Sequence, residues 1–224
     1  MAAGRKQVQV RRVGRPARRE SAEDVRRRLV AVARDLFAKR GFGEVGIREI
    51  ARVAEVTPGM ISYYFDDKLG LYEAMLASVF EEMLAKVREL AAQPSQGVGP
   101  LAALIRLYIG TIASHPWVPA LLLREIVTGD SGARARFIQR FAARAATLIP
   151  GLVSAEVESG DLRADLDPKL AVLSIVGMSI FPFLAHPLVG RVLGYELDAA
   201  FAERLIAHTM RLFFDGARAP ALAR

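Results

Sequence analysis

Apolar side chains recur every three to four residues along most of this chain, and no stretch of useful length alternates between apolar and polar side chains. The first spacing is that of one face of an α-helix, whereas alternation is the mark of a half-buried β-strand. The clearest stripe lies between residues 71 and 90 and consists of Leu71, Met75, Val79, Met83, Val87 and Leu90. The sequence therefore predicts an all-α fold.

Capping residues place the first and fourth expected helices. Ser21 and Asp24 form a capping-box signal, so a helix is expected to follow Ser21. Gly41 is expected to end it, because glycine adopts the left-handed conformation of a helix cap at low cost. Asp66 and Asp67 are expected to cap a long fourth helix.

Two short segments lie between these helices. The first covers residues 47–54, and Thr57 as N-cap with Pro58 at the first helical position predicts a second that runs to Phe65. Glu55 and Val56 separate the two segments. Two short helices joined by a three-residue turn predict a helix-turn-helix, whose second helix enters the major groove of DNA.

The two faces of this unit differ in chemistry. One face is apolar and is expected to hold the two helices together through Ile47, Ile50, Ala51, Val56, Ile61 and Phe65. The other face is expected to be available to DNA and carries Thr57, Pro58, Gly59, Met60, Ser62, Tyr63 and Tyr64. The N–H groups at the start of the second helix suit a phosphate oxygen, and Gly59 permits close approach of the backbone.

Several short motifs follow one another in this region. They are Ala33-Arg34-Asp35-Leu36-Phe37, Gly41-Phe42, Ile47-Arg48-Glu49-Ile50-Ala51, Ala54-Glu55-Val56-Thr57-Pro58-Gly59, and Ile61-Ser62-Tyr63-Tyr64-Phe65 followed by Lys68 and Leu71. In this order and register, residues 22–82 resemble the DNA-binding domain of the TetR family of transcription regulators. Gly46 replaces the family's usual Ser or Thr cap, Glu55 a common turn glycine and Ser62 a common aromatic residue, which affects the base contacts rather than the motif.

The resemblance implies roles for individual residues. Phosphates are expected to meet Arg48, Thr57 and, from the start of the fourth helix, Lys68. Base edges are expected to meet Pro58, Gly59 and Met60, and either Tyr63 or Tyr64 is expected to reach the DNA backbone or a base.

The net charge of +7 lies wholly in the first nineteen residues, which carry seven Lys and Arg and no acidic residue. A basic arm beside a helix-turn-helix favours a nucleic-acid partner, although a solubilising tail has the same composition. Gly14-Arg15-Pro16 resembles the core of an AT-hook, which predicts Arg15 in a narrow minor groove. A nonspecific basic arm remains the alternative.

The chain is expected to have three parts. These are an unstructured basic arm at 1–20, the helix-turn-helix DNA-binding domain at 21–82, and a larger helical domain at 83–224 that binds an effector and forms a dimer. Beyond a linker rich in Gln, Pro, Ser and Gly at 93–100, helices are expected near 100–114, 117–128, 131–159, 168–186 and 198–215. The roles of the larger domain are implied by the family resemblance.

The 21 residues from Leu170 to Gly190 carry no formal charge and are enough to cross a bilayer. Pro182 and Pro187 interrupt the segment and leave backbone groups unpaired in lipid. A helix buried in the core or in a dimer seam is therefore expected, with no membrane partner. The expected dimer contacts are Leu173, Val176, Gly177, Ile180, Phe201, Leu205 and Leu212.

An apolar cavity for the effector is expected beside the fourth helix. Its expected lining is Met75, Val79, Met83, Leu104, Tyr108, Trp117, Leu121, Phe137 and Phe141, although plain core packing uses the same residue types. Methionine and aromatic side chains favour a small apolar or amphipathic effector. Arg124 and Glu125, which follow an apolar run, are expected to form an intramolecular ion pair rather than to bind the ligand.

Signatures of catalysis, metals and cofactors are missing from the sequence. It has no cysteine and only three histidines, none spaced as paired ligands, so neither a metal site nor a cofactor is expected. Residues 41–46 match GxGxxG, but a helix rather than a strand precedes them, which disfavours a dinucleotide site. We therefore expect that the protein is not an enzyme.

These observations predict a cytoplasmic, homodimeric regulator that binds a palindromic site in double-stranded DNA and acts as a repressor released by its ligand. An architectural or less specific DNA-binding protein without an effector is the second candidate, favoured by the basic arm and Ser62. A regulator attached to a membrane through residues 170–190 is the third.

Overall fold

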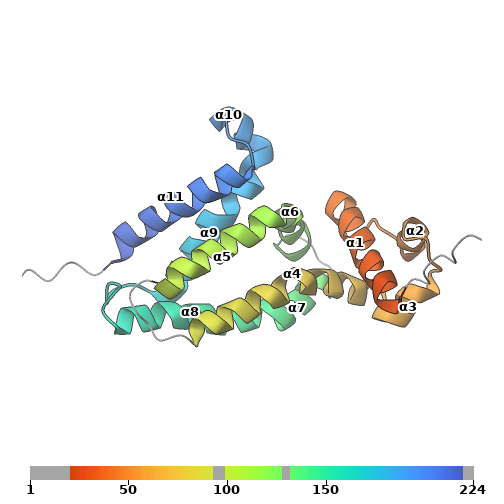
Figure 1. Ribbon diagram of the computed structural model, residues 1–224, viewed down its shortest axis with the longest axis horizontal. Coiled ribbons are helices and arrows are strands. Elements are labelled where there is room, and N and C mark those ends of the chain that lie inside the picture. Colours follow the sequence, from red (N-terminus) through yellow and green to blue (C-terminus); the bar gives the residue numbers. More distant parts are fainter. Residues whose placement is uncertain (1–20, 93–98, 128–131, 219–224) are drawn as a thin grey trace, which may run out of the picture.

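The computed structural model describes residues 21–92, 99–127 and 132–218, which form an all-α fold (Figure 1). Within these residues no β-strand is present, and one isolated bridge joins Leu162 to Arg218. The helical elements are α1 (Ala22–Arg40), α2 (Ile47–Val53), α3 (Gly59–Phe65), α4 (Lys68–Ala91), α5 (Gly99–Ser114), α6 (Trp117–Leu121), η1 (Leu122–Val127), α7 (Gly132–Phe137), η2 (Ile138–Ala142), α8 (Ala143–Glu158), α9 (Pro168–Ala185), η3 (His186–Gly190), α10 (Arg191–Leu193) and α11 (Ala199–Ala217).

Helix α4 runs along the length of the molecule. Helices α1 and α3 pack on its first half and α2 packs on α1 and α3, whereas α5, α7 and α8 lie along the rest of α4 (Figure 1). The boundary expected between residues 82 and 83 falls inside α4, which continues unbroken across it. The core around α1 to α4 also includes Val118, Leu121 and Phe141, so the N-terminal helices and the body share one hydrophobic cluster.

Local sequence signals position the ends of several helices as expected. The side chains of Ser21 and Asp24 form a reciprocal capping box, and Asp67 accepts a hydrogen bond from the Gly70 N–H. Asp167 accepts from two N–H groups at the start of α9, which begins at Pro168. Each cap satisfies N–H groups that have no partner inside the helix.

Gly41 and Gly70 differ from what the sequence predicts. Gly41 has the expected positive φ of 92°, but its ψ of 165° lies outside the left-handed helical region. The sequence predicts no role for Gly70, yet a Cβ atom at this position would lie 2.0 Å from the carbonyl oxygen of Phe65. Only glycine allows α4 to pass this close to the end of α3.

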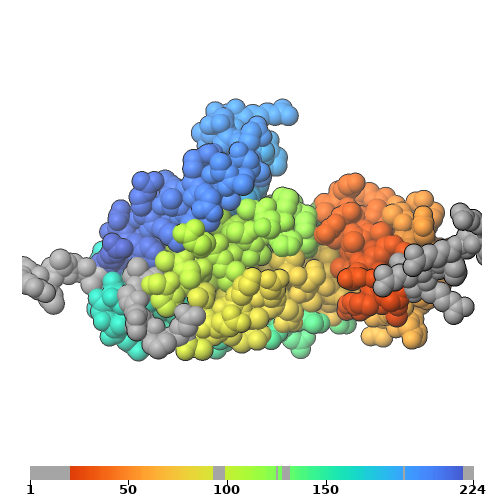
Figure 2. Space-filling model, in the orientation of Figure 1, coloured from red at the N-terminus to blue at the C-terminus, as the bar shows by residue number. Residues whose placement is uncertain are grey.

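Three expected helices contain π-helical turns. The segment near 117–128 divides into α6 and η1, that near 131–159 into α7, η2 and α8, and α9 continues into η3 and the short α10. Single π-turns inside helices occur often at functional sites. Around α10 the chain projects from the body, as the space-filling view also shows (Figure 2).

The apolar helix α9 is not buried within the body. By length and composition, Pro168–Leu188 could cross a membrane, and it is the only such helix in the described part of the chain. Only 22% of the stretch that meets this length and composition requirement is buried in the protein. The protomer's own core does not surround this segment, because α9 packs on α5, α6, α8 and α11 and leaves Leu170, Leu173 and Phe181 exposed. Burial in a dimer seam, the other alternative expected from the sequence, stays a prediction.

Glu156 of α8 is a fully buried acid. Its Oε1 accepts a hydrogen bond from the Leu101 N–H at 2.9 Å, whereas its Oε2 has no partner among the described residues. Burial, with a smaller contribution from the charge of Asp161, raises the pKa of Glu156 from an ordinary value of 4.5 to about 7, against the opposing effect of the Leu101 hydrogen bond. The folded state therefore holds the Glu156 proton more tightly than the unfolded chain does.

This raised pKa predicts a stability that depends on pH. The stabilisation from the protonated carboxyl is fully present below about pH 4.5 and is lost as the pH rises through about 7. We expect Glu156→Gln to remove this loss. The difference in unfolding free energy between the variant and wild type should therefore rise by roughly 1–3 kcal/mol, in favour of the variant, from acidic to mildly alkaline pH. Urea unfolding followed by circular dichroism across this range measures the difference, and parallel curves for the two proteins would contradict it.

Candidate nucleic-acid interface and apolar cavity

Helices α2 and α3 form a two-helix unit joined by a tight turn. Ile50 and Ala51 of α2 and Ile61 and Phe65 of α3 are buried, whereas Ile47 and Val56 are only partly so. Glu55 has a φ of 54°, which confirms the left-handed turn residue expected there. The apolar face thus fixes the two helices, and the opposite face of α3 is turned outward.

The sequence-predicted DNA contacts lie mainly on this outer face. Thr57, Pro58, Gly59, Ser62 and Arg48 are exposed, and Tyr63 is 78% exposed. Met60 and Tyr64 are partly buried and pack against the adjacent hydrophobic cluster. The Tyr63 ring stands edge-on to that of Tyr64, with ring centroids 4.9 Å apart. These residues therefore form one surface, to which Met60 and Tyr64 contribute only part of their side chains.

The start of α3 differs from the expectation. The helix begins at Gly59 rather than Pro58, and Pro58 takes the N-cap position without a side-chain hydrogen bond. The expected Thr57 side-chain cap is therefore wrong, and the Thr57 carbonyl instead accepts from the Met60 N–H. A Cβ on Gly59 would meet no atom within 4 Å, so the space beside it is open.

Lys68 has a role that the sequence did not indicate. Its Nζ donates hydrogen bonds to the carbonyl oxygens of Phe42 and Val45, at 2.8 Å and 3.0 Å, and lies 4.2 Å from the centroid of the Phe42 ring. Lys68 thereby ties the turn before α2 to the start of α4. The ammonium group has three N–H donors, so a phosphate contact through the third stays a prediction.

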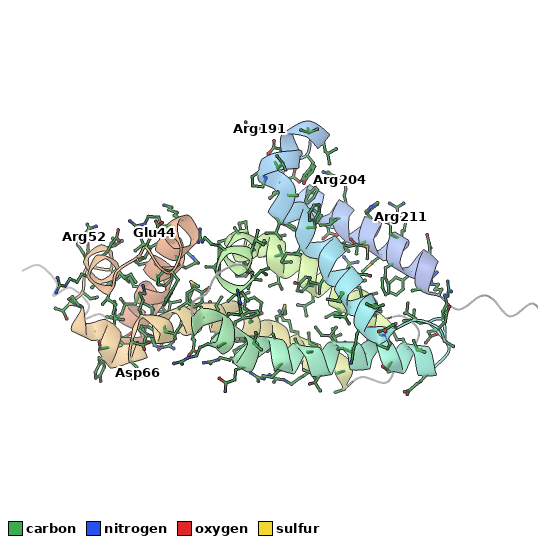
Figure 3. The ribbon with its side chains drawn as sticks, turned by 180° about the vertical axis from the view of Figure 1, so that it is seen from behind. Glu44, Arg52, Asp66, Arg191, Arg204 and Arg211 are labelled. Atoms are coloured by element: carbon green, nitrogen blue, oxygen red, sulfur yellow. The ribbon has the colours of Figure 1, made fainter. Side chains whose placement is uncertain are left out.

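Arg52 adds to this surface, although the sequence reasoning did not select it. It is exposed on the outer side of α2, as Figure 3 shows, whereas Asp66 lies at the end of α3. Arg48 and Arg52 make no ion pair with any described residue, while the nearby Glu49 is paired with Arg40 at 2.5 Å. The unit therefore presents two arginines whose charge is available to phosphates. Arg15 lies outside the described residues.

An apolar cavity of about 500 Å³ lies between α4, α5, α8 and α9 and reaches α6, η1, α7 and η2. Four of the nine residues expected for the effector site line it, namely Met83, Tyr108, Phe137 and Phe141. Val79 lines a separate hollow of about 750 Å³ between α4 and α5, together with Met83. Met75, Leu104, Trp117 and Leu121 line neither space, and the first two and Leu121 are buried in the core.

Arg124 joins the wall of this cavity to the N-terminal helices. Its neighbours in η1, Leu122, Leu123, Ile126 and Val127, line the cavity. The Arg124 Nη2 donates hydrogen bonds to the carbonyl oxygens of Phe37 and Ala38 in the last turn of α1. Carbonyl groups at a helix end attract a cation. The side chain of its expected partner, Glu125, is not among those described.

We expect Arg124→Met to loosen the end of α1 while leaving α3 folded. The carbonyl groups of Phe37 and Ala38 lose a charged donor, and the faster amide exchange at residues 38–42 should be measurable by hydrogen–deuterium exchange. Affinity for an operator fragment should fall about three- to tenfold, because α1 braces α2 and α3. Arg106→Met removes an exposed arginine that pairs with Glu203 at 3.5 Å and serves as the control. Equal exchange in the two variants would contradict the role of Arg124.

A second set of contacts joins α7, η2 and α8 to α4. Arg136 pairs with Glu73 at 3.0 Å, and Arg140 and Arg144 each pair with Glu81 at 3.3 Å. Such exposed pairs contribute little individually. They do fix α7, η2 and α8 in register along the helix that also carries α1 to α3.

The residues expected at a dimer interface separate into three groups. Leu173 and Gly177 of α9 and Leu212 of α11 are exposed. Val176 and Ile180 are partly buried and, with Leu173, line the apolar cavity. Leu205 and Phe201 lie on the side of α11 that packs on α5 and α9, and their role in a dimer stays a prediction. Leu205 is buried in its own protomer, and Phe201 stacks on Tyr195.

A continuous apolar stripe is nevertheless exposed on α9. It consists of Leu170, Leu173, Gly177 and Phe181, which recur at helical spacing, and it continues to Leu188, Val192 and Leu193. Arg191, Arg204 and Arg211 point outward from α10 and α11 (Figure 3). An exposed apolar patch with a polar rim is typical of a protein–protein interface.

Comparison with known proteins gives consistent results. Residues 29–75 match the family of bacterial regulatory proteins called tetR, and residues 98–212 match the tetracyclin repressor-like C-terminal domain. The transcriptional repressor KstR2 of Rhodococcus jostii is 29% identical over 158 residues, which cover 70% of this chain and 77% of that protein. The regulator RutR of Escherichia coli is 26% identical over 216 residues, covering 93% and 97%. The solved structure of FadR from Bacillus subtilis with stearoyl-CoA has a TM-score of 0.65 at 18% identity, covering 82% and 96%.

Proposed function

Because this chain belongs to the TetR family of bacterial regulatory proteins and is a DNA-binding transcription regulator, we propose that it is a homodimeric repressor. In this proposal it binds a palindromic operator in the cytoplasm, without catalysis, and a small apolar or amphipathic molecule releases it. The observation that carries the proposal is the exposed face of α3. Gly59, Ser62 and Tyr63 lie on this face, whereas Ile61 and Phe65 of the same helix are buried.

The proposed contacts with DNA follow from exposure and charge. Arg48, Arg52 and Thr57 are proposed to hold phosphates, since they are exposed beside the start of α3. Pro58, Gly59, Met60, Ser62 and Tyr63 are proposed to face the major groove, with Tyr64 supporting Tyr63. Phosphate contacts position the protein, whereas contacts with base edges give sequence specificity.

Dimer formation is supported by the exposed stripe of α9. Two copies can bury Leu170, Leu173, Gly177 and Phe181 against each other, and a symmetric dimer reads a palindrome because each protomer contacts one half-site. We propose a second copy rather than a membrane as the partner of this stripe, because Pro182 lies within α9 and Pro187 within η3.

Release by a ligand is supported by the connections of the apolar cavity. Its wall includes α4, which continues into the N-terminal unit, and η1, whose Arg124 holds the end of α1. In a dimer, the two α3 helices must have a spacing that fits DNA. A ligand that binds better to a state with another spacing increases the population of that state and so releases the protein from DNA. FadR of Bacillus subtilis was solved with stearoyl-CoA, whose acyl chain is apolar, and this supports an apolar effector here.

A footprinting experiment tests the proposal. Sites selected from random DNA should share a palindrome with half-site centres about one helical turn, ~34 Å, apart. Protection confined to that palindrome supports the repressor. Uniform coverage of any duplex would instead support the architectural DNA-binding protein that the basic arm and Ser62 also allow.

A further inference from the structure

We propose that the apolar cavity selects an uncharged ligand with an apolar body and one hydroxyl or carbonyl group, and that Tyr108 recognises that group. This inference rests on the effector function proposed above. It adds the chemical class of the ligand and the residue that determines it.

The wall of the cavity excludes a charged ligand. Apart from Tyr108, every described residue that lines it is Ala, Val, Leu, Ile, Met, Phe or Pro. These side chains offer neither a cation to pair with a carboxylate or phosphate nor an anion to pair with an amine. An ion that leaves water without gaining a partner is strongly disfavoured, whereas an apolar body gains from the contact.

Tyr108 is the one described residue of the cavity lining that carries a side-chain hydroxyl. It extends from α5, is partly buried, and has no hydrogen bond to any described residue. Burial raises the pKa of Tyr108 to about 12, so the hydroxyl keeps its proton at every physiological pH. It can therefore donate one hydrogen bond and accept others, but it adds no charge.

A hydroxyl in apolar surroundings discriminates between ligands. A ligand oxygen that reaches Tyr108 satisfies both polar groups, whereas a ligand without such an atom leaves the hydroxyl unpaired. The volume of about 500 Å³ lies within the range of sites for small organic molecules. The cavity therefore fits a compact hydrophobic molecule with one well-placed oxygen.

The other hollow of about 750 Å³ has the opposite character. It is lined by Glu82, Lys86, Arg106 and His115, among others. Glu82 and Lys86 pair with each other at 2.7 Å, and Arg106 pairs with Glu203 at 3.5 Å. Its charged groups are thus already engaged within the protein, and we assign no ligand to it.

Three matched probes test the inference, namely 4-pentylphenol, pentylbenzene and 4-pentylbenzoate. They share an apolar body and differ in carrying a neutral hydroxyl, no polar group or a negative charge at mildly alkaline pH. Affinity is measured on the full-length protein without DNA, by displacement of the neutral dye N-phenyl-1-naphthylamine. We expect 4-pentylphenol to bind about tenfold or more tightly than 4-pentylbenzoate.

Variants separate recognition by Tyr108 from general binding. Tyr108→Phe should weaken 4-pentylphenol about three- to tenfold without weakening pentylbenzene, because pentylbenzene then leaves no hydroxyl unpaired. Tyr195→Phe removes a hydroxyl that bonds to the Pro182 carbonyl outside the cavity and should alter neither affinity. Ala145→Phe adds a ring to a cavity-lining position and should weaken all the probes, which locates their site.

Two results would overturn the inference. One is binding of 4-pentylbenzoate as tightly as 4-pentylphenol, and the other is an unchanged affinity of a folded Tyr108→Phe variant for 4-pentylphenol. Operator release is measured separately with the same probes. If 4-pentylphenol binds as expected but leaves the operator complex intact, ligand release fails and the binding inference stands. If an anionic compound releases the operator, the inference fails and the regulatory function stands.

Discussion

Gly59→Glu is expected to weaken operator binding about 100-fold or more while leaving the protein folded. A Cβ at this position meets no atom within 4 Å, so the protein has room for the new side chain. A carboxylate near the N-terminus of α3 also interacts favourably with the helix dipole, which favours the folded state. The same carboxylate faces phosphates in the proposed complex, and a dimer carries two of them.

A charge series makes this prediction specific. Fluorescence anisotropy with a labelled operator should give affinities in the order Gly59→Lys above Gly59→Gln above Gly59→Glu, because the open space accepts all of these side chains. Gly151→Glu makes the same change on the exposed side of α8 and should bind the operator like wild type. If Gly59→Glu melts normally and binds like Gly151→Glu, α3 is not the recognition helix.

Gly177→Glu is expected to convert the dimer into monomers and to weaken operator binding about 100-fold, since a single protomer holds only one half-site. Gly177 lies in the middle of the exposed stripe, between Leu173 and Phe181. A Cβ there also meets no atom within 4 Å, so each protomer should fold. In a tightly packed seam, however, the side chain meets its own copy and buries two like charges.

Sedimentation equilibrium measures the oligomeric state of this variant. Gly151→Glu again serves as the matched control, because it alters charge and helix propensity equally at an exposed position of α8 outside the α9 stripe. The melting temperature of monomeric Gly177→Glu must be compared with that of wild type at low concentration, where dimer formation contributes little. A variant that stays dimeric with normal operator affinity excludes α9 as the seam.

The helix-turn-helix could be predicted closely because its signals are local. Capping side chains, the spacing of Ile50, Ile61 and Phe65, and the turn at Glu55 all act within a few residues. The start of α3 differed by one residue, because the helix begins at Gly59 with Pro58 as its N-cap, although Pro58 already has helical φ and ψ angles of −56° and −33°. Such ends depend on single hydrogen bonds that sequence patterns do not resolve.

The roles of several individual side chains could not be predicted. Lys68 reaches carbonyl groups more than twenty positions earlier, and Arg124 reaches Phe37 across 87 positions. Neither partner is visible in a local pattern, because backbone carbonyls occur at every residue. In the same way, Met75 and Leu121 have the composition expected of a cavity wall but lie in the packed core.

By itself the sequence determined the helical class, the position of the DNA-binding unit and the apolar character of α9, since periodicity and capping act between near neighbours. Only the tertiary structure decided which apolar residues enclose a cavity, which fill the core and which remain exposed on α9 and α11. The physical reason is that apolar side chains of similar size are interchangeable in a pattern. Their surroundings are set by the angles at which helices distant in the sequence pack together.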